Sequence, residues 1–356
     1  MGASSVSGPI CPRAVAPSVL GMDTSGTLEE ALERLHSTGP ERNGWLSNHA
    51  PMVAEALAAH GRAGAVHHWL DLYRDKLEDF PDPVDPVTDD NWPSALGDPR
   101  RAADWIDHFS RTLAERPWRS VLAVWWPRLL PGISAGATHP VIRVGHAVRA
   151  LGADENEPRL TELAHSLGYW AARYQPVSGI APLPGGRNAA DSLDAVPPIV
   201  QGPAGFRARL EAVRQLPVWA GEVSDPDVAR ERLTELVRAA THRYATHGHG
   251  EPTMLVHAAT APNAVLRTLD ALPRELWAPS LRAAWTASAA VTAMYTPSEP
   301  IGYTTSRRLT AEEVLELAVA HGDEHVIKFT DTALDVGDET ALVAAVRAVE
   351  ISEPLV

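Results

Sequence analysis

The stretch that decides the fold reads AVHHWLDLYRDKL, from Ala65 to Leu77. Its apolar side chains recur every three or four residues, which is the spacing that lines one face of an α-helix. The same spacing recurs along most of the chain, at residues 98–115, 117–130, 140–151, 158–172, 204–214, 225–241, 253–271, 275–295, 310–321, 323–336 and 339–349. Strands with alternating apolar and polar residues are hard to find. The pattern therefore predicts an all-α fold.

Turn and cap signals predict how the helices are organised. Residues 27–30 read Thr-Leu-Glu-Glu, a capping box that would open the first helix. Residues 1–26 are rich in Gly, Ser and Pro, so we expect a disordered or extended tail there, followed by one helical domain over 27–356. Two proline-rich stretches, 80–97 and 176–203, are expected to be long loops beside a buried site.

Composition restricts the function. The 356 residues carry a formal net charge of −14, which argues against a nucleic-acid partner. Cys11 is the only cysteine, so a disulfide-stapled fold and a cysteine-rich metal site are excluded. No apolar run approaches the ~20 residues that span a bilayer, and we expect a cytoplasmic protein without a membrane partner.

Common catalytic motifs are also missing. The sequence has no G-x-G-x-x-G, no Walker A loop, no G-x-S-x-G elbow and no H-E-x-x-H. A dinucleotide fold, a serine hydrolase of the usual kind and a zincin therefore have little support.

Scattered histidines are the strongest functional signal. Histidine is the commonest metal ligand, and His49, His139, His146 and His257 stand in segments that only a folded interior could bring together. His139 and His146 are two helical turns apart, about 10.5 Å; either both bind from opposite ends, or one is a ligand and the other supports it. Pro262 is expected to kink the helix that His257 opens, unless that helix ends near residue 261.

His325 and Lys328 are the last members of this group. At i and i+3 they share a helix face that has apolar neighbours. A buried lysine must lose its proton, pair with a carboxylate or be modified. A carboxylated amine would offer an anionic oxygen to a metal, whereas the alternative is a salt bridge to Asp323, Glu324 or Asp331.

Several of these segments together resemble the questin oxidase-like family, whose members open anthraquinone-type polyketide rings. The matching segments are Ser47-Asn48-His49-Ala50-Pro51-Met52, His139-Pro140-x-Ile142, Tyr169-Trp170-Ala171-Ala172-Arg173-Tyr174, His257 with Thr260-Ala261-Pro262, and His325-Val326-Ile327-Lys328. The resemblance implies a mononuclear non-haem iron site with His49, His139, His257 and His325 as ligands, joined by modified Lys328. Family members tend to have an additional histidine where this chain has Arg143, so either His146 replaces that ligand or the site of this chain differs. We assign His146 both as a candidate ligand and as a candidate catalytic residue.

The resemblance also implies a substrate and an activity. We expect an oxygenase that uses Fe(II) and O₂ on a small aromatic polyketide, by carbon–carbon cleavage or Baeyer–Villiger-type oxygen insertion. Tyr169 and Tyr174 are assigned to the catalytic region as a stacking wall for a flat substrate, although helix-core aromatics give the same pattern. The alternatives are an NADPH-dependent oxygenase without a metal and an inactive ligand-binding protein. The metal could also be zinc or nickel, and the protein a monomer or homodimer.

Overall fold

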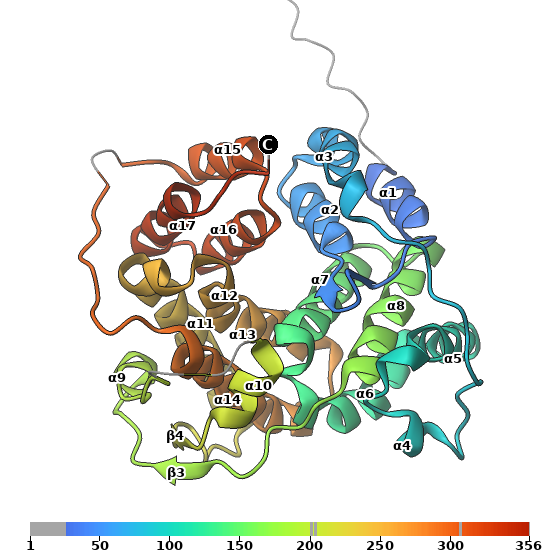
Figure 1. The fold of residues 1–356 in the computed structure, drawn as a ribbon, viewed down its shortest axis with the longest axis horizontal. Coiled ribbons are helices and arrows are strands. Elements are labelled where there is room, and N and C mark those ends of the chain that lie inside the picture. Colours follow the sequence, from blue (N-terminus) through green and yellow to red (C-terminus); the bar gives the residue numbers. More distant parts are fainter. Residues whose placement is uncertain (1–25, 200–201, 203–204, 306–307, 356) are drawn as a thin grey trace, which may run out of the picture.

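The periodic segments form helices in a computed structural model, which describes residues 26–199, 202, 205–305 and 308–355 (Figure 1). The first half contains α1 Thr27–Leu35, α2 Ala50–Ala59, α3 Val66–Tyr73, α4 Trp92–Ala95, α5 Ala102–Glu115, α6 Trp118–Leu129, α7 His139–Ala153 and α8 Glu157–Arg173. The second half contains α9 Ala189–Asp194, α10 Phe206–Ala212, α11 Pro226–His247, α12 Pro252–Leu255, α13 His257–Thr268, α14 Trp277–Tyr295, α15 Ala311–His321, α16 Glu324–Val336 and α17 Glu339–Ile351. The predicted all-α fold is confirmed.

Short elements complete the chain. Two small sheets are formed by β1 Glu41–Arg42 with antiparallel β2 Leu46–Ser47, and by β3 Ala181–Leu183 with parallel β4 Gln215–Pro217. The 3₁₀ turns are η1 Ala63–Ala65, η2 Arg74–Lys76, η3 Pro99–Arg101, η4 Leu130–Gly132, η5 Ala135–Thr138, η6 Gly248–Gly250, η7 Leu269–Ala271 and η8 Arg274–Leu276.

One predicted cap is wrong. Helix α1 begins at Thr27, but its N-cap is Gly26 with φ 81°, and no side chain caps the first turn. The helix therefore starts one residue too early for Thr27 to act as a cap. A complete capping box is found instead at Thr310 and Glu313, at the start of α15.

Four helices form a ring in the middle of the molecule. Helix α2 packs on α7, α7 on α13, α13 on α16, and α16 back on α2, and Figure 1 shows them around the centre. The contact between α7 and α13 is especially close, because a Cβ on Gly145 would lie 2.6–2.9 Å from atoms of Ala264. Only a glycine allows this separation.

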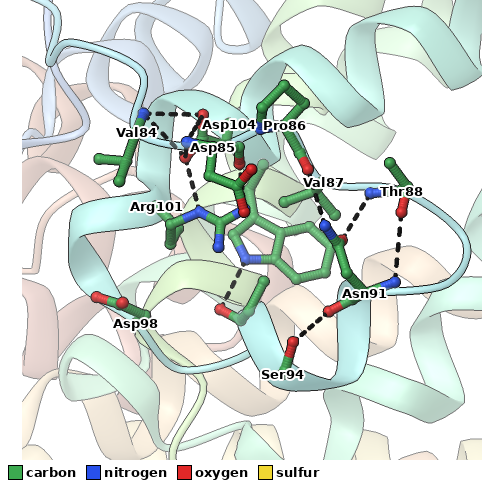
Figure 2. A network of polar contacts seen from close by, with 12 residues as sticks. Val84, Asp85, Pro86, Val87, Thr88, Asn91, Ser94, Asp98, Arg101 and Asp104 are labelled. Carbon is green, nitrogen blue, oxygen red and sulfur yellow. Dashed lines mark hydrogen bonds and ion pairs between the residues drawn. The ribbon is translucent and has the colours of Figure 1, made fainter.

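The proline-rich segment 80–97 is an ordered loop around one short helix, α4. Buried Asp104 of α5 accepts the backbone N–H groups of Val84 and Asp85 at 3.0–3.2 Å, and Arg101 Nε donates to it at 2.8 Å (Figure 2). These bonds replace the backbone pairing that proline removes. The segment 176–203 contains β3 and α9 between its prolines, and residues 200, 201 and 203 lie outside the described part.

Two further predictions concern the N-terminal tail and the membrane. Residues 1–25 of the predicted tail lie outside the described residues. Within the described part, no helix combines the length and the apolar character that a membrane crossing requires.

Candidate metal centre

Four histidines meet where the ring helices begin. His49 is the residue before α2, His139 opens α7, His257 opens α13, and His325 is the second residue of α16. The ring centroid of His49 lies 4.5 Å from the centroid of His139 and 4.5 Å from that of His325. The centroids of His139 and His257 are also 4.5 Å apart. The fold thus brings together four side chains that are spread over most of the sequence.

The tautomers of two of these rings are fixed by backbone carbonyls. His139 Nδ1 lies 2.7 Å from the Gly136 carbonyl oxygen, and His257 Nδ1 lies 3.1 Å from that of Met254. A carbonyl only accepts, so each Nδ1 carries the proton and each Nε2 presents a lone pair. The two Nε2 atoms nevertheless face each other at 2.9 Å. Two lone pairs at this distance repel each other, and a cation beside both nitrogens would remove the repulsion.

A proton is a poor candidate for that cation. Burial, followed by the nearby charges of His257 and Lys328, holds the pKa of His139 well below its ordinary value. Burial and Lys328 do the same to the pKa of His257. The rings are therefore neutral near pH 7, and the donor set fits a metal ion that binds imidazole nitrogen.

The backbone before His139 is held in an uncommon conformation. Gly136, Ala137 and Thr138 all have positive φ angles, of 50°, 56° and 68°. Left-handed backbone at non-glycine residues costs on the order of 1–3 kcal/mol each and persists where the surroundings enforce it. Here the left-handed turn places the Gly136 carbonyl against His139 Nδ1, so the strain orients a candidate ligand.

Helix α13 continues through Pro262, so it does not end near residue 261. Pro262 has no N–H to donate to the Ala258 carbonyl one turn earlier. The Ser288 hydroxyl of α14 donates to that carbonyl instead, at 2.7 Å. This replacement allows a proline inside the helix that carries His257.

Lys328 lies in the same interior. Its side chain is buried, and its Nζ has no hydrogen-bond partner among the described residues. Burial lowers the pKa of Lys328 to about 8, although Glu324 and Asp323 act in the opposite direction. None of the ion pairs in the described part joins Lys328 to Asp323, Glu324 or Asp331 by direct contact, so of the three outcomes expected for a buried lysine, loss of the proton and modification are left.

The choice of lysine is itself informative. The chain has 31 Lys and Arg residues, and only Lys76 and Lys328 are lysines, so 29 are arginines. Arginine stays charged, whereas a buried lysine amine can become neutral and then react. A lysine retained in the interior of an arginine-rich chain is consistent with a chemical role.

Glu324 is a site residue that sequence reasoning did not assign to His49. Its buried carboxylate lies 3.5 Å from His49 Nδ1, 3.2 Å from Lys76 Nζ and 3.7 Å from Arg42. His49 Nδ1 makes no hydrogen bond in the described part, so Glu324 acts on the ring through its negative charge, which draws Nδ1–H toward the carboxylate and leaves Nε2 for a metal. Its position next to His325 in the sequence was the available signal.

His146 lies elsewhere. Its Nδ1 is 2.6 Å from Glu55 Oε2 and its Nε2 is 3.9 Å from Asp331 Oδ2. Both ring nitrogens therefore face carboxylates rather than the other histidines, because two turns of α7 separate His146 from His139. His146 therefore lies apart from the four histidines, with Nδ1 bonded to Glu55 and Nε2 facing Asp331 beyond hydrogen-bond distance.

The carboxylates around His146 belong to a buried charged layer that joins all four ring helices. Glu55 of α2 and Asp331 of α16 each pair with Arg149 of α7, at 2.5 and 2.8 Å, and Asp331 also pairs with Arg267 of α13 at 2.8 Å. Burial alone would raise the pKa of Glu55, but Arg149 and His146 bring it down to about 2. This layer fixes the four helices relative to one another below the histidines.

A pocket of about 700 Å³ opens onto the histidines. His49, His139 and His325 line it, and so do Trp45, Tyr174 and Phe206. Its volume is within the range of small-molecule sites. Lys328 lies outside this lining, buried behind it.

The two predicted tyrosines have different positions. Tyr174 lines the pocket. Tyr169 is 1% exposed, and its hydroxyl bonds to Ser47 Oγ at 2.6 Å, behind the wall that Ser47 forms. Trp170 is a core residue that donates to the Gly132 carbonyl. Of these three aromatic residues, Tyr174 is the one placed to touch a ligand in the pocket.

Comparison with known proteins supports the resemblance drawn from the motifs. None of the curated proteins matches the chain. Residues 46–165 match the family model described as questin oxidase-like. The matched part contains His49, His139 and His146, whereas His257, His325 and Lys328 lie beyond it. The resemblance predicted from the motifs is therefore confirmed over residues 46–165, where the chain is similar to the questin oxidase-like family.

Proposed function

We propose that this protein is an oxygenase that acts on an aromatic polyketide at a mononuclear non-haem iron site. His49, His139, His257 and His325 would hold the iron, together with an oxygen of carboxylated Lys328. The observation that carries the proposal is the pair of Nε2 lone pairs of His139 and His257, 2.9 Å apart with both Nδ1 atoms bonded to carbonyls. The questin oxidase-like match supports the reaction class, that of an oxidoreductase.

Charge explains why a carboxylated lysine suits the site. Four neutral imidazoles offer no negative ligand, whereas non-haem iron oxygenases usually provide a carboxylate. A neutral Lys328 amine would attack CO₂, forming the carbamate N–C bond and releasing one proton. Four helix N-termini also point at this centre, and their partial positive charges stabilise an anion there.

Each part of the chain would then have a defined task. Bound iron(II) would supply the electrons that activate O₂. Helices α2, α7, α13 and α16 hold the ligands in a buried layer, and the pocket above them accommodates a flat tricyclic molecule. Carbon–carbon cleavage would place both oxygen atoms of O₂ in the product and needs no further reductant. Baeyer–Villiger-type insertion of one oxygen would release the other as water and take two electrons and two protons from an added reductant.

The test is aerobic turnover of hydroxylated anthraquinones by tag-free protein that has been stripped of metal and reloaded with Fe(II) in bicarbonate buffer. We expect O₂ uptake and a product one or two oxygen atoms heavier with Fe(II), and neither with Zn(II) or with His257→Ala. Arg100→Gln, at an exposed pair with Asp98, is the matched control and should keep full activity. Turnover by stripped protein that requires only NADPH would overturn the proposal.

A further inference from the structure

The β1–β2 hairpin forms one wall of the pocket mouth. Asn43, Gly44 and Trp45 make its three-residue turn, in which Asn43 and Gly44 have φ angles of 51° and 74°. Arg173 of α8 donates to the Gly44 carbonyl at 2.9 Å and pairs with Glu41. The hairpin is thus fastened to α8 through Arg173, which itself lines the pocket.

Trp45, the last residue of this turn, is unusually exposed. It lines the pocket, yet 62% of it is open to solvent, which is among the largest exposures of any large apolar side chain described here. An exposed aromatic side chain at a pocket mouth is available to pack against the apolar face of a ligand. Phe206 and Tyr174 also line the pocket, so a flat ring system would meet aromatic faces from three separate elements.

Arg42 supplies an unbalanced positive charge to the same wall. Among the other ionisable groups lining the pocket, Arg173 pairs with Glu41 and Arg207 pairs with Glu211. Arg42 shares the single carboxylate of Glu324 with Lys76. Two cations on one carboxylate leave a surplus positive charge, and Arg42 Nε is buried without a hydrogen-bond partner in the described part.

We infer that the hairpin selects the substrate: Trp45 stacks on a planar aromatic ring, and Arg42 receives an ionised oxygen, a phenolate or carboxylate, on that ring. This inference rests on the proposed function, because it defines which aromatic molecules reach the histidines. An arginine holds such an oxygen by charge-assisted hydrogen bonds. With its charged oxygen at Arg42, the substrate would extend from the hairpin along the pocket toward the histidines.

The experiment measures equilibrium binding of two probes, an anthraquinone carboxylate and the matching carboxamide, to Zn(II)-loaded full-length protein. Trp45→Ala should weaken both probes about tenfold or more, and Trp45→Phe should restore most of the loss. Arg42→Gln should weaken the carboxylate about tenfold and leave the carboxamide unchanged. Val84→Ala, at a residue 63% exposed and outside the pocket lining, should change neither.

Three results would overturn the inference: Trp45→Ala binding like the wild type, Arg42→Gln weakening both probes equally, or the wild type binding neither probe. Zinc content is measured for every variant, so that a loss of metal at the neighbouring Glu324 is not read as a loss of probe contact. If the hairpin variants bind and turn over aromatics like the wild type, and turnover still depends on iron, the inference fails while the proposed function stands. If both probes bind as expected but turnover does not depend on iron, the proposed function fails while the inference stands.

Discussion

Replacing Lys328 with methionine should make the metal-free protein more stable. Methionine has a similar length and no charge, so it removes a buried ammonium group that has no hydrogen-bond partner among the described residues. The pKa of Lys328 falls from 10.5 to about 8 because the side chain is buried. At about 1.4 kcal/mol per pKa unit, the charged form costs the folded state about 3 kcal/mol at pH 7.

The sign of the pH dependence follows from the two pKa values. Below pH 8 the lysine is protonated in both states, so the folded protein bears the whole cost. Between about 8 and 10.5 the folded lysine is neutral while the unfolded one still binds a proton, and the cost declines. The advantage of Lys328→Met should therefore fall from about 3 kcal/mol at pH 7 to about 1 kcal/mol at pH 9.5.

Urea unfolding of chelator-treated protein measures both values. Lys76→Met is the matched control, because Lys76 is the only other lysine and pairs with Glu324; it should give no gain at either pH. The same Lys328→Met protein should bind iron at least about tenfold more weakly. A metal-free Lys328→Met protein that is less stable than the wild type at pH 7 would refute the reasoning that Lys328 is an unpaired buried cation.

Three further changes test the parts around the histidines. Glu324→Gln should lower metal affinity about 10–100-fold, because His49 loses the carboxylate that orients its ring; competition with a chelator measures this. Glu55→Gln should destabilise the protein by about 3–5 kcal/mol in urea at pH 7, because it removes one of the two carboxylates that balance the charge of Arg149. In the wild type this contribution should disappear as the pH falls from 4.5 toward about 2, since the folded pKa of Glu55 is the lower one. Gly145→Ala should cost about 1–3 kcal/mol and weaken metal binding, because its Cβ would push α7 away from Ala264; a thermal melt and the same chelator titration check it.

The helices could be read from the sequence because their apolar faces repeat at a strong, local period. The four histidines at helix starts also followed from local signals, such as Pro51 and Pro140 in first turns. His146 was predicted as a candidate ligand partly because residues seven apart share a helix face. In the structure, the same spacing puts the His146 side chain two turns along α7 from His139, in the charged layer.

The pocket wall was harder to predict. Strands of two residues are too short to show alternation, so the hairpin that carries Arg42 and Trp45 gave no strand pattern. Its one local signal was the Asn43-Gly44 pair, which is typical of a tight hairpin turn. Tyr169 and Tyr174 lie on one aromatic segment, but only tertiary packing decides that Ser47 covers the first and leaves the second in the pocket.

The proposed function requires that the histidine cluster bind iron. Elemental analysis of tag-free protein, purified without added metal, measures this, with His257→Ala and Arg100→Gln purified alongside. We expect about one iron per chain in the wild type and in Arg100→Gln, and close to none in His257→Ala. A folded wild-type protein without metal, or iron that remains in His257→Ala, would contradict it.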